Sequence, residues 1–209
     1  MARSRTSKTH YIKGEVAAFK RERIVDAAVD LFYDHGYEHT TLDAVAQRLG
    51  VTKPFIYSYF ESKTALLSEI CSRGIKASLD AINESLALRS SPVEQLNEFS
   101  KKFTRAVLQS QKHIAVFSRE EKNLSKPDFE RISDMRREFD RKLTALLDRG
   151  VAKGEFRVRD TRLVSLAIGG MVSWSYVWYR PKGRLTLDEV ANQMAVLILQ
   201  MAQARAVET

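Results

Sequence analysis

Apolar residues recur along the chain at steps of three and four, and no stretch shows the period-two alternation that is typical of a strand. Because three to four residues make one helical turn, this pattern predicts helix through most of the chain. The predicted helices span about 24–36, 41–49, 52–60, 62–88, 92–112, 114–123, 127–153, 160–180 and 186–205. The expected fold class is therefore all-α, with about nine helices.

The ends of the first three helices carry clear local signals. Gly36 can close the first helix in the left-handed conformation, and the Thr41 hydroxyl can cap the second. A turn at Gly50 follows, and Thr52 is expected to cap the third helix. Pro54 falls in the first turn of that helix, where a missing N–H costs nothing. The segment therefore reads helix, turn, helix, which is the order of a helix-turn-helix.

Length and composition are those of an ordinary globular protein that is large enough for two domains. The chain has 209 residues, of which 44% are hydrophobic and 29% charged, and this excludes a disordered chain. We expect a first domain over residues 1–63, with an N-terminal arm and the helix-turn-helix, and a second domain over residues 64–209. The arm carries four basic residues that suit either a solvated tail or insertion into a minor groove: Arg3, Arg5, Lys8 and Lys13.

The sequence gives no sign of export or of membrane insertion. Cys71 is the single cysteine, so no intramolecular disulfide can form. Met1–Gly14 lacks the apolar core of a secretory signal. The uncharged stretch Leu163–Tyr179 is shorter than the ~20 residues of a membrane span and contains glycine and serine, so we expect a buried helix there.

The second helix of a helix-turn-helix enters the major groove, where its first residues meet base edges. Here that helix is Thr52–Phe60, which is too short to be stable alone and must pack through Phe55, Ile56 and Phe60. Lys63, beside the next helix N-terminus, suits a phosphate. The other side chains of Thr52–Phe60 suit phosphate oxygens and groove edges: Thr52, Lys53, Tyr57, Ser58 and Tyr59. Ordinary core positions are the alternative for the two tyrosines.

This region resembles the tetracycline-repressor (TetR) family of bacterial regulators over about Glu22–Leu67. The shared elements are, in order, AA..LF..HGY, a threonine before the second helix, the turn A..LGVT, and YSYF.SK.AL. The resemblance implies backbone contacts from Thr41, Tyr57, Tyr59 and Lys63. It implies groove contacts from Arg48, Thr52, Lys53, Pro54, Phe55 and Ser58. Pro54 and Phe55 replace the small residues that are common at those positions, so no base preference carries over.

The resemblance also implies a cytoplasmic bacterial regulator, more often a repressor, that reads a two-fold operator as a homodimer. We expect the dimer surface on the last two helices, where the earlier one offers two small residues, Gly169 and Gly170. The later one alternates steps of three and four, the pattern of paired helices, at Leu187, Val190, Met194, Leu197 and Met201. The alternative is that these helices only close the core of the monomer.

The passage YVWYRPKGRLTLDEVANQMAVLIL is similar to the C-terminal end of TetR regulators that control fatty-acid or sterol breakdown and respond to acyl-CoA thioesters. Residues 64–209 carry +6 of the net charge of +8, which suits an effector with phosphates because arginine binds phosphate in a fork. Candidate ligand residues are Arg105, Arg162 and Arg180 for the phosphates, and Trp174 and Trp178 for the apolar part. For the two tryptophans structural packing is the favoured role, and contact with the ligand is the other.

Enzymes and architectural DNA-binding proteins are the two other classes of function to consider for this sequence. The four histidines are scattered, and the sequence contains no metal-ligand pair, nucleophile elbow or phosphate loop. We therefore expect no enzyme activity, no cofactor and no metal. A ligand-independent architectural DNA-binding protein is the alternative function, but such a protein would not need a large second domain.

Overall fold

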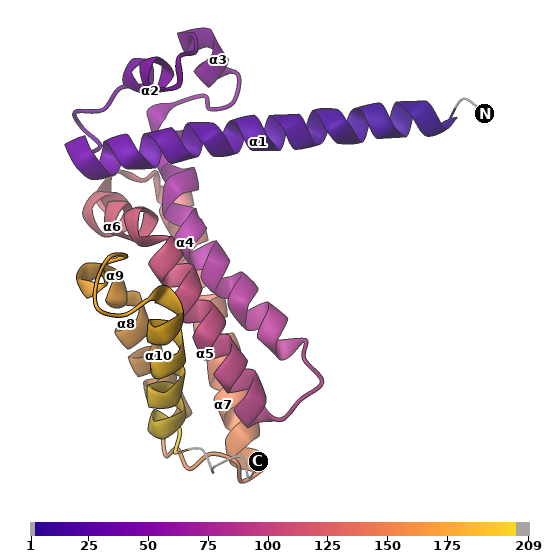
Figure 1. Ribbon diagram of the computed structural model, residues 1–209, viewed down its shortest axis with the longest axis vertical. Helices are drawn as coiled ribbons and strands as arrows, with labels where there is room; N and C mark the ends of the chain where they lie inside the picture. The colour runs from indigo at the N-terminus through magenta and orange to yellow at the C-terminus, as the bar shows by residue number, and fades with distance from the viewer. Residues whose placement is uncertain (1–2, 204–209) are drawn as a thin grey trace. The chain divides into compact units, whose positions relative to one another are not determined.

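The computed structural model describes the backbone of residues 3–203 and the side chains from Gly14 onward. Every regular element within that range is a helix (Figure 1), which confirms the all-α prediction. Two compact units make up the chain. One is built from residues up to Ile70 together with Val116–Ser125, and the other from Cys71–Ala115 together with the residues from Lys126 on. The side chains of Arg3, Arg5, Lys8 and Lys13 lie outside the described part.

The first unit surrounds a small apolar core. Its helices are α1 (Arg3–His35), α2 (Leu42–Leu49), α3 (Lys53–Tyr57), the start of α4 (Lys63–Leu86), the end of α6 (Gln111–Glu120) and the 3-10 turn η1 (Glu121–Asn123). Buried side chains of the first four of these, and of the segment just after α3, form the core: Ile24, Phe32, Val45, Ile56, Phe60 and Leu66. α1 begins well before the predicted residue 24, because residues 14–23 are almost all exposed and add no apolar stripe to the sequence.

The predicted helix ends of this unit are largely confirmed. Gly36 follows α1 at φ 82°, and Gly50 closes α2 at φ 66°, so both adopt the left-handed conformation that favours glycine. The Thr41 Oγ1 accepts a hydrogen bond from the Ala44 amide at 3.1 Å, which caps α2. These local signals fix where α2 begins and ends, and with it the start of α3.

The second unit packs long helices around an aromatic core. Its elements are the rest of α4, α5 (Pro92–Gln109), the start of α6, α7 (Lys126–Ala152), α8 (Thr161–Ser173), α9 (Ser175–Trp178) and α10 (Leu187–Met201). α10 packs along α5, and α8 along α7 (Figure 1). At the centre of the core Phe99, Phe103 and Phe139 meet with ring centroids 5.0–5.8 Å apart.

The single helix predicted over 160–180 is interrupted at Trp174. Ser175, between the two tryptophans, is fully buried, and its Oγ donates to the Val172 carbonyl at 2.6 Å. A side-chain hydrogen bond to a nearby carbonyl competes with the helical ladder, and here α8 gives way to the short α9. Trp174 and Trp178 are 62% and 48% exposed, so neither side chain belongs to the core of the described chain.

The pattern predicted as a dimer seam on α10 is divided between the core and the surface. Val190 and Met194 are buried against Leu108 and Tyr179 of the same chain, so these two positions close the monomer core. Leu197 is 46% exposed, and its neighbour Val196 is 54% exposed. Of the predicted seam, Leu197 therefore lies on the outward face of α10, beside Val196, whereas Val190 and Met194 face the core of the monomer.

Candidate DNA-binding surface and effector sites

One face of α3 holds it against the first unit. Ile56 is fully buried, and Phe60, just after the helix, is 2% exposed. Phe55 is half-buried, with its ring 5.2 Å from the ring of Tyr59. The helical part of the segment is only Lys53–Tyr57, shorter than predicted, because Ser58 and Tyr59 form a turn after it. Packing of Ile56 and Phe60 thus turns the other face of α3 toward solvent.

The residues predicted to meet DNA lie together on the first unit. Thr41, Arg48, Thr52, Lys53, Pro54, Tyr57 and Ser58 are exposed, whereas Phe55, Tyr59 and Lys63 are half-buried. A surface cleft of about 420 Å³ is lined by Thr41, Lys53, Tyr57 and Lys63 and by two acidic residues, Asp43 and Glu61. Burial of Lys53, Tyr57 and Ser58 would have excluded contact with a duplex. Their exposure permits it, and the contacts stay a prediction.

Thr52 stands at the N-cap position of α3, but its side chain makes no capping hydrogen bond, so that part of the prediction is wrong. Pro54 has no amide hydrogen to donate, and the Phe55 amide bonds to the Thr52 carbonyl at 3.0 Å instead. The Thr52 hydroxyl is therefore not used to start the helix. Ser58, at the other end, donates from Oγ to the Phe55 carbonyl at 2.7 Å.

Lys53 is held by a carboxylate from α2. Its Nζ donates to Asp43 Oδ2 at 2.9 Å, and it lies 6.0 Å from the centroid of the Tyr57 ring. The hydrogen bond and the charge of Asp43 raise the pKa of the Lys53 ammonium. The cation predicted to contact DNA is thus already paired across the turn between α2 and α3.

Lys63 is also engaged within the first unit. Its Nζ donates to the Tyr37 carbonyl at 2.9 Å and lies 4.2 Å from the centroid of the Tyr37 ring. Arg48, by contrast, has a longer ion pair, 3.8 Å, with Asp30 of α1. Lys63 therefore joins the start of α4 to the loop after α1, a role that the sequence did not indicate.

Arg21 is a residue of this surface that the sequence analysis missed. One guanidinium nitrogen donates to the Tyr59 carbonyl at 2.9 Å, another to Glu69 of α4 at 3.1 Å, and the group stacks 4.2 Å from the Phe60 ring centroid. It connects α1, the end of the α3 segment and α4. Arg21 lies three residues before the buried Ile24 and so on the same, inner face of α1. This spacing could have indicated that its guanidinium packs within the unit.

The residues predicted to bind an effector do not converge on one site. Arg105 pairs with Asp188 of α10 at 2.8 Å. Arg180 donates to the carbonyls of Val177 and Tyr179 at 2.9 and 3.0 Å, closing α9. Two of the three candidate arginines thus have structural partners.

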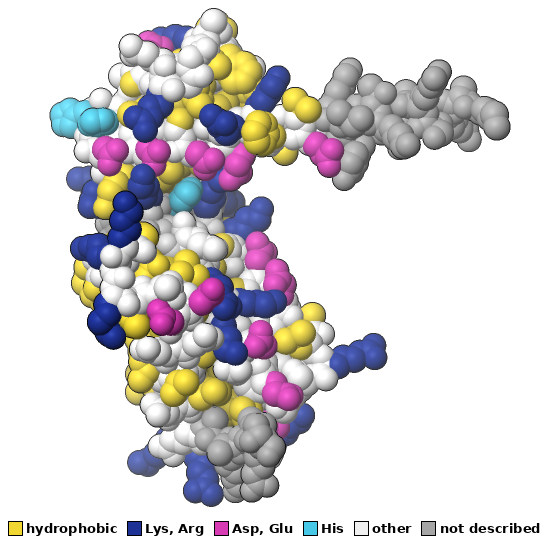
Figure 2. Space-filling view, in the orientation of Figure 1, with side chains coloured by type: hydrophobic (Ala, Val, Ile, Leu, Met, Phe, Trp, Pro, Cys, Tyr) yellow, Lys and Arg dark blue, Asp and Glu magenta, His cyan; other side chains and the backbone are white. Residues whose placement is uncertain are grey.

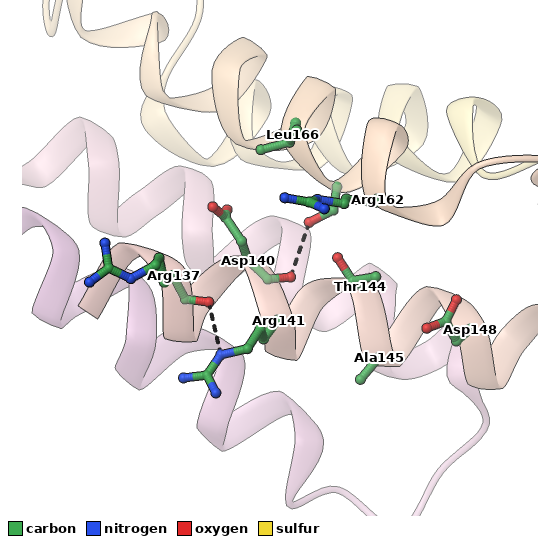
Figure 3. A pocket seen from close by; sticks show the side chains of 9 residues that line it. Arg137, Asp140, Arg141, Thr144, Ala145, Asp148, Arg162 and Leu166 are labelled. Atoms are coloured by element: carbon green, nitrogen blue, oxygen red, sulfur yellow. Dashed lines mark hydrogen bonds between the residues drawn. The ribbon is translucent and has the colours of Figure 1, made fainter. Parts of the chain in front are cut away.

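Arg162 lies in a groove of about 480 Å³ between α7 and α8. Its guanidinium points toward the carboxylate of Asp140, whereas Arg137 and Arg141 point theirs away from it (Figure 3). Partial burial raises the pKa of the Asp140 carboxyl, and the charges of Arg136 and Arg162 oppose that rise. The arginine side chains point in different directions, and a carboxylate lies among them. This groove is therefore poorly suited to bind several phosphates.

Trp174 and Trp178 line a second groove, of about 360 Å³, whose other walls are mostly apolar. The remaining lining residues come from α8, the loop before α10 and α10 itself: Met171, Leu185, Val190, Gln193, Met194 and Leu197. An apolar chain fits such walls better than a phosphate does. Their contact with a ligand stays a prediction.

Among the described residues, no group of three or more His, Cys, Asp or Glu side chains could hold a metal ion. Within the same range no helix has the length and hydropathy to cross a bilayer.

Known proteins resemble the chain over most of its length. The repressor KstR2 of Mycolicibacterium smegmatis is 26% identical over 87% of this chain and 90% of its own. The fatty acid metabolism regulator protein of Bacillus subtilis is 23% identical over 86% of this chain and 94% of its own. The crystal structure of AibR in complex with isovaleryl coenzyme A and operator DNA has a TM-score of 0.73. The two sequences are 23% identical, and the match covers 89% of this chain and 100% of the AibR chain. Both curated relatives are regulators by name.

Two family models match in the expected order. Residues 24–70 match the model of bacterial regulatory proteins of the tetR family, and residues 89–202 match the tetracyclin repressor-like C-terminal domain. The first model covers α3 and the helices packed around it, and the second covers most of the second unit. The chain belongs to the tetR family of bacterial regulatory proteins.

Proposed function

We propose that this chain is a homodimeric repressor that binds a palindromic operator and is released by a small-molecule effector, an acyl-CoA thioester. The observation that carries the DNA-binding part is the solvent-facing side of α3, where Lys53, Tyr57 and Ser58 are exposed while Ile56 is buried. A helix held in this way can dock its outer residues in a major groove. The proposal places the protein in the bacterial cytoplasm, where it meets its operator.

The two parts of the chain divide this work. Residues 1–63 bind DNA, through Thr41, Tyr57, Tyr59 and Lys63 on the backbone and through Arg48, Thr52, Lys53, Pro54, Phe55 and Ser58 in the groove. Residues 64–209 bind the effector and form the dimer. α4 has residues in both compact units, so a tilt of this helix on ligand binding would move the DNA-binding part. In the dimer, the two recognition helices would then no longer keep the ~34 Å separation that matches adjacent half-sites.

The dimer surface lies on the outward faces of α8 and α10. Leu163 and Leu166 of α8 are 63% and 50% exposed, and Val196 and Leu197 of α10 are 54% and 46% exposed. Apolar atoms reach the surface over α10 in Figure 2. Contiguous exposed apolar side chains are typical of an interaction surface, and a two-fold partner would bury the same face on both subunits.

The groove beside Trp174 and Trp178 suits the acyl part of the effector. Its apolar walls favour a hydrocarbon chain, and the +6 charge of residues 64–209 favours the phosphates of coenzyme A. Leu197 belongs both to this groove and to the proposed dimer face. A ligand here would therefore touch the surface that sets the spacing of the two subunits.

Selection of bound fragments from bacterial genomic DNA tests the DNA-binding part. We expect a few fragments with a two-fold motif to be retained, and weaker retention of all duplexes as salt is raised. Failure to retain any duplex at low ionic strength would contradict the proposal.

Titration of the protein–operator complex with matched pairs of a free acid and its CoA ester tests the effector. Release by the ester alone is expected. An equal response to both, tighter binding, or no response across short, branched and steroid-sized acyl groups would remove the acyl-CoA assignment. A thermal-shift screen separates this from the architectural alternative, since ligand at 100 times its Kd stabilises the protein by about 2.7 kcal/mol.

A further inference from the structure

The ion pair between Asp43 and Lys53 lies on the surface proposed to meet DNA. The two side chains are 58% and 55% exposed, and they join the first turn of α2 to the first residue of α3. Exposed ion pairs add little to folding stability, and neither side chain is needed to fill the core. Asp43 also lies in the first turn of α2, where the helix dipole favours a carboxylate. Its pairing with Lys53 across the turn between α2 and α3 is what places both groups on the surface proposed to meet DNA.

A carboxylate in this cleft opposes phosphate contact. Asp43 lines the same cleft as Thr41, Tyr57 and Lys63, which are predicted to meet the DNA backbone. A phosphate placed beside Asp43 is repelled, and Lys53, which Asp43 holds at 2.9 Å, is drawn away from phosphates. Toward a bound duplex, the charge of Asp43 is favourable only where it faces a hydrogen-bond donor of the DNA.

The major groove offers such donors only on base edges. They are the amino groups of cytosine and adenine, and Asp is suited to the amino group of cytosine, whereas Lys is suited to the O6 and N7 acceptors of guanine. These groups are neighbours in a G·C pair, because the cytosine amino group pairs with guanine O6. An acceptor and a donor held side by side on the protein match this arrangement.

We propose that Asp43 and Lys53 act together as a specificity-determining pair that reads one G·C base pair in each half-site. Lys53 donates to the guanine, and Asp43 accepts from the cytosine amino group. Asp43 also limits non-specific affinity, because it keeps the Lys53 ammonium from binding phosphates. The inference rests on the proposed docking of α3 in a major groove.

The test is a selection of duplexes from a random-sequence library with the full-length wild type, Asp43→Asn and Lys53→Gln. We expect a G·C pair in each half-site of the wild-type motif, and loss of that preference by about tenfold or more in both variants while the other positions persist. Asp43→Asn should also bind random duplex more tightly, with a salt slope steeper by about one, because Lys53 is released to phosphates.

Glu138→Gln is the matched control. It removes a carboxylate from an ion pair of the second unit, with Lys142 at 2.7 Å in α7, whose two members are half-buried. It should keep the wild-type motif and affinity. Thermal melting of each variant shows that it is folded.

An Asp43→Asn motif identical to that of the wild type would overturn the inference. So would a uniform loss of affinity with the motif unchanged, since Asp43 would then only orient a phosphate contact. In both cases the wild type still selects a motif, and the proposed function stands. A wild type that retains no duplex would overturn both.

Discussion

At the scale of single residues, the glycine at the end of α7 leaves no space for a side chain. A Cβ built on Gly150 would lie 1.9 Å from Cδ2 of Phe156, whose ring is 2% exposed. Gly150→Ala should therefore lower the free energy of unfolding by about 1–3 kcal/mol through overpacking, measured by urea denaturation. Gly14→Ala is the control, because Gly14 is also helical and meets nothing within 4 Å. Equal effects of the two substitutions would contradict this account.

Arg21 should matter for both stability and DNA binding. Arg21→Met removes the hydrogen bonds to the Tyr59 carbonyl and to Glu69. We expect a loss of about 1–3 kcal/mol in unfolding free energy and weaker operator binding, because the end of the α3 segment loses its tie to α1 and α4. Arg21→Lys should not restore either property, since one ammonium cannot reproduce the planar fork.

Chemical denaturation and an operator titration measure these two effects. Arg23→Met, two residues further on and exposed, serves as the control and should leave both nearly unchanged. Full recovery with Arg21→Lys would show that only the charge is needed.

Residue-level predictions from the sequence succeeded for the cap at Thr41 and the turn at Gly50, and failed for the side-chain cap at Thr52. Thr41 and Gly50 act through the chain next to them, so their types were enough to predict a cap and a turn. The partners of Lys63 and Arg105 lie 26 and 83 residues away, and spacing along the sequence carries no information about them. Both cations were expected to meet external phosphates, and both already have partners inside the protein.

At the scale of elements, hydrophobic periodicity predicted the order of the helices because most of them bury one stripe of side chains. It did not predict the break at Trp174, since Leu163–Tyr179 is uncharged and its two glycines, Gly169 and Gly170, lie a turn earlier, inside α8. Nor did it separate the two faces of α10, where Val190 is buried and Leu197 exposed although both are apolar. When a helix is apolar on both faces, one for its own core and one for a partner, its sequence does not show which face is buried in the monomer.

The start of α10 should show a defined pH dependence. The Thr186 amide donates to Glu189 Oε2 at 2.7 Å, and the Glu189 amide donates to Thr186 Oγ1 at 3.2 Å, which is a capping box. The bond from the Thr186 amide lowers the pKa of the Glu189 carboxyl in the folded protein. A carboxyl with a lowered pKa stabilises the fold above the ordinary value, and this contribution is lost as pH falls through the lowered one.

Glu189→Gln keeps an acceptor but loses the charge. We therefore expect a lower thermal midpoint than in the wild type at neutral pH, and a difference that shrinks as the pH falls below about 4.3, the ordinary glutamate value. Calorimetry over a pH series measures it. Glu94 makes the same box with Ser91, with its pKa lowered by the same kind of bond, so Glu94→Gln should repeat the result. A difference that stays constant down to pH 2 would contradict the assignment.

At the scale of the whole molecule, dimer formation and DNA binding should be inseparable. Leu163→Glu places a charge on the most exposed leucine of α8, where it costs nothing in a monomer but must be buried without a partner in the proposed dimer. We expect a folded monomer by analytical ultracentrifugation. Its operator affinity should be at least ~100-fold lower, because two linked recognition helices gain that much by binding together.

The matched control is Phe129→Glu, which changes an apolar side chain of similar exposure, 45%, at the start of α7. It should stay dimeric and bind the operator as the wild type does. If Leu163→Glu remained a dimer, the subunits would meet through some other surface than α8. If it became monomeric but kept its operator affinity, a single recognition helix would suffice, and the spacing of two helices could not be the quantity that an effector changes. Only the loss of both properties together supports a switch that acts through the dimer.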